Sequence, residues 1–97
     1  MHVAPIVSGR LLTPENSRYL RARCVVLRPG DEVGEHATGD MEEVLLVLGG
    51  AAVVDVCGSR TDVPCGHCAF IPPNTRHNVL NLCETETRYV YVRSLEK

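Results

Sequence analysis

The sequence predicts an all-β protein, folded as a barrel or sandwich, with at most one short helix near the N-terminus. Three features support this class: polar and apolar residues alternate along several segments, the apolar runs have the length of strands, and Gly or Pro residues separate them. The chain of 97 residues shows no internal repeat or linker. We therefore expect a single domain over residues 1–97, with the barrel at about 20–93.

The N-terminal third contains one candidate helix and one strand. Thr13 followed by Pro14 is typical of a helix start, because Thr caps the free amides and Pro suits the first helical position. The helical pattern fades within one turn, so we expect only a short helix or a turn there. Between Tyr19 and Leu27, residues alternate with a period of two, which predicts a half-buried strand. Pro29-Gly30 ends this strand with a turn.

The remainder of the chain reads as a series of short strands. Residues 43–48 are almost continuously apolar, which predicts a strand buried on both faces and ended by Gly49-Gly50. We expect residues 51–57 to return as its hairpin partner across this glycine turn. The other segments that we expect to be strands are 60–63, 68–71, 77–82 and 88–92.

Charge and composition argue against several functional classes. The formal net charge is −2 and the sequence has no Lys/Arg cluster, so we expect no nucleic-acid partner. No apolar stretch reaches the roughly 18 residues of a membrane span. The N-terminus lacks a secretory signature, so we expect no membrane association and a cytoplasmic location. The five cysteines are expected to be reduced thiols.

Cys65 and Cys68 have the spacing of a redox-active pair. That chemistry requires a helix at the first cysteine, which lowers its pKa. Pro72 and Pro73 follow too closely for such a helix. We therefore do not expect a thiol redox function.

Strand alternation places metal-ligating side chains inside the barrel. If Leu45 and Val79 fill the interior, Glu43 and His77 enter it too, because residues two apart in a strand share a face. A buried carboxylate is costly unless it is paired or bound to a cation. With His36 these residues form a set of two His and one carboxylate. Such a set suits Fe(II), and Mn, Ni, Co or Zn would also fit.

The residues around this set resemble the two motifs of the cupin superfamily. The first motif matches at Gly30, His36, Glu43 and Gly50. The second motif matches at Gly66, Pro72, Asn74, His77 and Asn81. The resemblance covers residues 26–92 and implies a small cupin-type β-barrel, also described as a double-stranded β-helix or jelly roll.

Two positions depart from the motifs. Asn74 replaces a Gly, a mild change because Asn tolerates a left-handed backbone. Thr38 stands where the family has its second His. The resemblance implies three His and one Glu as metal ligands, so His36, Glu43 and His77 carry over, with Thr38 at the vacated position. Water could fill that vacancy, and both a bound divalent transition metal and an empty site stay open.

Four residues are candidates for contacting a small-molecule ligand: Thr38, Arg76, Tyr89 and Tyr91. The tyrosines alternate with valines, so they supply hydroxyls to a ligand if they face the cavity. Arg76, beside His77, could reach an anionic ligand at the barrel mouth.

Three functions remain open from the sequence. The first is the binding of a divalent metal and a small polar metabolite. The second is a metal-dependent enzyme such as a dioxygenase, isomerase or lyase, since fold alone cannot decide whether the protein is catalytic. The third is a metal-free structural dimer with a decayed site. We expect a homodimer in any case, because Val44, Leu46 and Leu48 face away from the barrel core and need cover.

Overall fold

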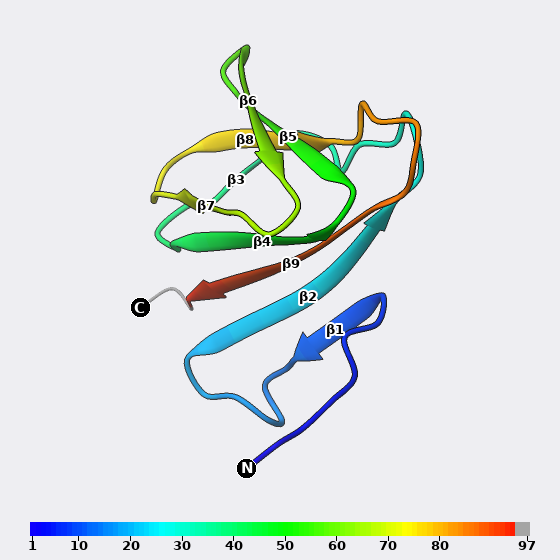
Figure 1. Cartoon of the computed structure of the whole chain (residues 1–97). Helices are drawn as coiled ribbons and strands as arrows, with labels where there is room; N and C mark the ends of the chain where they lie inside the picture. The colour runs from blue at the N-terminus through cyan, green and yellow to red at the C-terminus, as the bar shows by residue number, and fades with distance from the viewer. Residues whose placement is uncertain (95–97) are drawn as a thin grey trace.

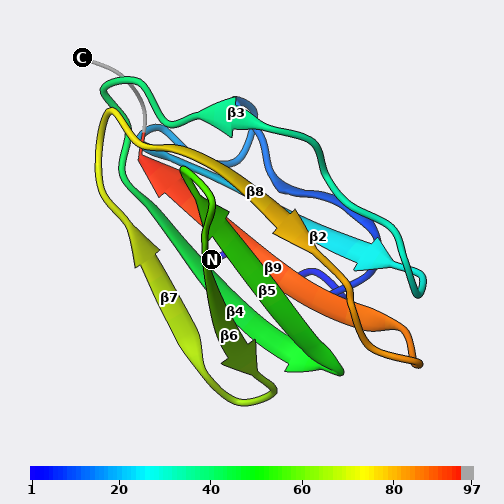
Figure 2. The same cartoon turned by 90° about the horizontal axis from the view of Figure 1, so that it is seen from above.

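The computed structural model describes residues 1–94 of the chain. This part contains nine strands and no helix. They form two antiparallel sheets that face each other (Figures 1 and 2). The first sheet has the order β1-β2-β9-β4-β7 and the second the order β3-β8-β5-β6. The predicted all-β class is therefore confirmed. The strands are β1 (Gly9–Leu12), β2 (Leu20–Leu27), β3 (His36–Ala37), β4 (Glu43–Gly49), β5 (Ala51–Val56), β6 (Ser59–Pro64), β7 (Cys68–Ile71), β8 (Arg76–Leu80) and β9 (Thr87–Ser94).

Each of the strands predicted from the sequence is present, with ends that differ by at most two residues. β1 and β3 were not expected: β3 has two residues and β1 is interrupted by a bulge, so neither shows a periodic pattern. The segment after Thr13 forms a turn in which the amides of Asn16 and Ser17 both donate to the Thr13 carbonyl. Within residues 1–94 no helix is available to cross a membrane.

The expected hairpin between β4 and β5 is wrong. β4 pairs with β7 and β9, whereas β5 pairs with β6 and β8, so the two strands belong to different sheets. Gly50 lies where the chain crosses from one sheet to the other, with a φ of 69°. A Cβ at this position would lie 2.4 Å from the Glu86 carbonyl oxygen, so a larger residue cannot be placed without a backbone shift.

Alternation along β4, β8 and β9 builds the core between the sheets. Leu45 is fully buried, and Val47, Val79 and Tyr89 are almost so. Side chains from both sheets complete this cluster. Because Glu43 and His77 lie two residues from core residues on the same strands, they are buried with them. The predicted burial of Glu43 and His77 is thereby confirmed.

The outer face of β4 is covered by nothing in residues 1–94. Leu46 is 39% exposed and Leu48 47% exposed, and Phe70 on the neighbouring β7 is also exposed. The prediction that β4 is buried on both faces is therefore wrong for the single chain. A continuous apolar sheet face of this kind is typical of a protein–protein contact.

We expect this face to hold a second copy of the chain, so the protein should run as a homodimer. Leu46→Glu places a charge in the contact and should yield monomers, because an unpaired buried charge is costly. Light scattering at micromolar concentration measures the mass. Leu82→Glu is the control, since Leu82 is exposed outside the strands. A monomeric parent protein would contradict the prediction.

Candidate metal centre

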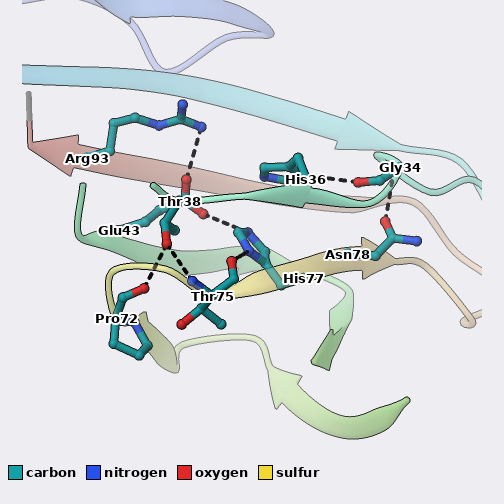
Figure 3. Close-up of polar contacts among 9 residues, drawn as sticks. All are labelled: Gly34, His36, Thr38, Glu43, Pro72, Thr75, His77, Asn78 and Arg93. Atoms are coloured by element: carbon teal, nitrogen blue, oxygen red, sulfur yellow. Dashed lines mark hydrogen bonds and ion pairs between the residues drawn. The ribbon is translucent and has the colours of Figure 1, made fainter. Parts of the chain in front are cut away.

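The three predicted ligands come together between the two sheets (Figure 3). His36 and His77 are direct cross-strand partners on β3 and β8, and their ring centroids lie 4.2 Å apart. Glu43, the first residue of β4, approaches from the other sheet. Each of the three offers one ligand atom, and these atoms all lie within 4.8 Å of one another.

Backbone carbonyls orient both imidazoles. Nδ1 of His36 lies 3.0 Å from the Gly34 carbonyl oxygen, and Nδ1 of His77 lies 3.2 Å from that of Thr75. A carbonyl only accepts hydrogen bonds, so each Nδ1 carries the proton and donates it. In the neutral form of each imidazole, Nε2 consequently keeps its lone pair, which is the arrangement that supports metal ligands in proteins.

The Nε2 atom of His77 is buried and has no hydrogen-bond partner among residues 1–94. It lies 3.4 Å from Oε2 of Glu43. Two acceptor atoms facing each other at a buried position are unfavourable unless a proton or a cation lies between them. The Glu43 side chain raises the pKa of His77, burial opposes that effect, and the Thr75 carbonyl adds to it. Without a metal, the proton is therefore held more tightly than by an ordinary imidazole.

The spacing also suits a metal ion. With bond lengths of about 2.1 Å and angles of about 90–109°, neighbouring ligand atoms lie about 3.0–3.4 Å apart. The Nε2–Oε2 separation of 3.4 Å meets this requirement directly. His36, which is half-buried, also has its ligand atom within 4.8 Å of those of the other two residues.

Arg93 is a member of the site that sequence reasoning missed. Its Nη2 donates to Oε1 of Glu43 over 3.1 Å, and its guanidinium lies 4.8 Å from the centre of the Tyr91 ring. The ion pair keeps one carboxylate oxygen occupied while the other faces His77. The predicted strand ended at Val92. Extending the alternation of Tyr89 and Tyr91 by one more step would have identified Arg93.

Thr38, at the position of the missing His, is engaged with the backbone. It is buried, its hydroxyl donates to the Pro72 carbonyl over 2.8 Å, and it accepts from the Thr75 amide over 3.0 Å. The hydroxyl thus joins the segment after β3 to the loop before β8. Asn74 in that loop has a φ of 54°, the left-handed conformation that Asn tolerates.

We expect Thr38→Val to destabilise the protein without changing its metal content. The variant keeps the shape of the side chain and removes two hydrogen bonds, so unfolding free energy should fall by about 1–3 kcal/mol. Urea denaturation and elemental analysis measure the two quantities. Loss of metal with unchanged stability would show instead that the hydroxyl acts toward the metal.

A cavity of about 300 Å³ opens next to the ligand set. His36 and Glu43 line it, together with the two tyrosines of β9, while His77 is buried and does not line it. Tyr89 and Tyr91 therefore face inward. Burial, reinforced by the negative charge of Glu43, raises the pKa of Tyr89, so its hydroxyl stays protonated at neutral pH.

Arg76 does not line this cavity, although its ion-pair partner Glu35 does. It neighbours His77 on β8 and so points to the opposite side of the strand. Its side chain is exposed and forms an ion pair with Glu35 at the surface. The structure therefore brings Tyr89 and Tyr91 to the cavity, but neither the Arg76 guanidinium nor the Thr38 hydroxyl.

The structure is thus a small β-barrel of two sheets, with a His/Glu/His group between them that could hold a metal ion. A family model for the cupin domain matches residues 23–93. The chain belongs to the cupin family. The resemblance found in the two motifs is thus confirmed.

Other proteins share this domain. Protein SchB of Streptomyces halstedii is 33% identical over 66 residues, which cover 68% of this chain and 48% of SchB. The chain thus spans about half the length of that relative.

Solved structures support the fold. A Cupin 2 conserved barrel domain protein from Salinispora arenicola has a TM-score of 0.81 at 23% identity, covering 96% of this chain and 87% of that chain. A predicted oxalate decarboxylase from Thermotoga maritima has a TM-score of 0.75 at 24% identity, covering 90% and 77%. At these identities the likeness concerns the fold alone.

Proposed function

We propose that this chain is a small cupin that binds one divalent transition metal through His36, Glu43 and His77. We further propose that the adjacent cavity holds a small polar metabolite. The observation that carries the proposal is the buried Nε2 of His77, which faces a carboxylate oxygen at 3.4 Å and has no hydrogen-bond partner within residues 1–94. A cation removes that conflict, and the Nδ1 hydrogen bonds hold both imidazoles ready for it.

The ligand set leaves coordination positions open. Three protein ligands do not complete the shell of Fe, Mn, Ni, Co or Zn, and Thr38 uses its hydroxyl elsewhere. When bound, the metal would supply a Lewis acid at the base of the cavity. Tyr89 and Tyr91 would hold polar groups of the metabolite, and the ion pair with Arg93 orients the Glu43 side chain.

A metal-dependent enzyme is the second candidate function. It is favoured by the open positions beside a cavity, since a catalytic metal needs a place for its substrate. The Thermotoga maritima protein is described as a predicted oxalate decarboxylase, so oxalate is one substrate to include in an assay, although the likeness itself concerns the fold alone. We place the protein in the cytoplasm, a proposal supported by its five unpaired cysteines.

Elemental analysis tests the metal proposal. The protein is purified without a His-tag, and Fe, Mn, Ni, Co and Zn are measured before and after incubation with each ion. About one equivalent of one metal is expected. A content below about a tenth of an equivalent that does not increase on loading would contradict both metal functions and favour the metal-free structural dimer.

A further inference from the structure

A second cavity, next to the metal centre, is lined by arginines. It has a volume of about 410 Å³ and lies against β1, β2 and β9. Arg10, Arg21, Arg23 and Arg93 all line it. Tyr91 and Arg93 belong to this cavity and to the one beside the metal ligands, so the two cavities adjoin. No Asp or Glu from residues 1–94 lines this second cavity.

The strand register places these arginines opposite one another. Arg10 is the direct cross-strand partner of Arg23, and Arg21 is that of Arg93. Like charges directly opposite in an antiparallel sheet destabilise it. Here the same unfavourable pairing occurs twice on one face, once between β1 and β2 and once between β2 and β9, in the half of the sheet that ends at β1 (Figure 1). Local conflicts of this kind are expected at functional sites.

Little of this positive charge is neutralised within residues 1–94. Arg93 pairs with Glu43. Arg21 donates to two backbone carbonyls, which orient the guanidinium without cancelling its charge. Arg10 and Arg23 form no ion pair with any carboxylate in this part of the chain. These arginine side chains are therefore available to bind an anion from solution.

We propose that the arginine face, defined as Arg10, Arg21 and Arg23, binds a multiply charged oxyanion group of a small molecule. A phosphate ester and a pair of carboxylates share the required chemistry, because the guanidinium fork matches both. The remainder of the molecule extends past Tyr91 toward the metal centre. The concave setting suits a small molecule, since nucleic acid requires an extended basic stripe. The binding of the anionic group does not depend on the proposed metal function. Only the position of the other end of the molecule, near the metal centre, rests on it.

The test uses metal-free protein, so that its outcome does not depend on metal binding. Inorganic phosphate and succinate are titrated at constant ionic strength, with acetate as the singly charged comparison. Calorimetry gives the affinity, and NMR of the arginine Nε–Hε groups locates the anion. We expect saturable binding of phosphate or succinate that shifts the signals of the arginine face. Tighter binding of phosphate would indicate a phosphate ester as the ligand, and tighter binding of succinate would indicate a dicarboxylate.

Matched variants separate a built site from general charge attraction. Arg23→Gln should weaken binding of the preferred anion about tenfold, as loss of a charge-assisted hydrogen bond requires. Arg28→Gln makes the same charge change on an exposed residue just after β2, outside the cavity, and should change affinity less than about twofold. Equal weakening in the two variants, or no saturable binding below about 10 mM, would overturn the proposal.

Thermal unfolding without added anion provides an independent readout. Arg23→Gln relieves a like-charged pair, so its melting temperature should rise by about 1–5 °C while its affinity falls. A fall in both would mean that Arg23 serves folding and would overturn the assignment. If the anion binds at the arginine face but the protein binds no metal, the proposed metal function is contradicted and the proposed anion site is supported.

Discussion

Replacing His77 by alanine is expected to remove the bound metal, with a loss of affinity of at least about 100-fold. The variant deletes the one ligand whose Nε2 is both buried and without a hydrogen-bond partner in residues 1–94, and leaves Glu43 paired only with Arg93. Elemental analysis of the purified variant, followed by titration with the metal found in the parent, measures the effect.

Two further variants make the result specific. His77 is fully buried, so its alanine variant must be checked for folding by circular dichroism. His36→Ala should lose metal as well, at a smaller cost in stability because His36 is only half-buried. His67→Ala, at an exposed turn position, should retain the metal content of the parent. Full metal retention in His77→Ala would contradict the assigned ligand set.

Metal affinity is also expected to decrease about tenfold for each pH unit below the pKa of His77. Protons and the metal compete for the same Nε2 atom, so acidification favours the proton. The neighbouring Glu43 raises that pKa above its usual 6.5. The decline should consequently begin at a higher pH than for an ordinary imidazole ligand. Competition titrations against a chelator of known proton affinity, between about pH 8 and about pH 5, measure the profile.

Glu43→Gln checks the cause of this pH dependence. NMR titration of the metal-free proteins should show a lower His77 pKa in the variant, because its main raising interaction is removed. Affinity that stays constant from about pH 8 to about pH 5 in the parent would show that His77 is not a ligand.

Local patterns were sufficient to predict seven of the nine strands and the burial of Glu43 and His77. Side chains alternate strictly along a strand, so placing Leu45 and Val79 in the core also placed Glu43 and His77 there. Strand pairing is not local. The expected β4–β5 hairpin assumed that consecutive strands pair, but Gly50 carries the chain into the other sheet.

The parts of the site that the sequence did not reveal depend on contacts between distant segments. The Thr38 hydroxyl bonds to backbone groups 34 and 37 residues away, so nothing near it signals this role. The arginine face, with Arg93 beside it, exists only because the register of β1, β2 and β9 brings these separate residues to one cavity. Arg93 was missed for a simpler reason, since the predicted last strand was two residues too short.

The position of β9 has a consequence for the way the protein folds. β9 lies between β2 and β4, so neither of these strands has its central partner until residues 87–94 arrive. The Arg93–Glu43 ion pair joins residues 50 positions apart. Closing such long loops before their contacts form makes folding slow compared with proteins rich in local contacts. Both cavities take lining residues from β9, so neither is complete until β9 has paired with its neighbours.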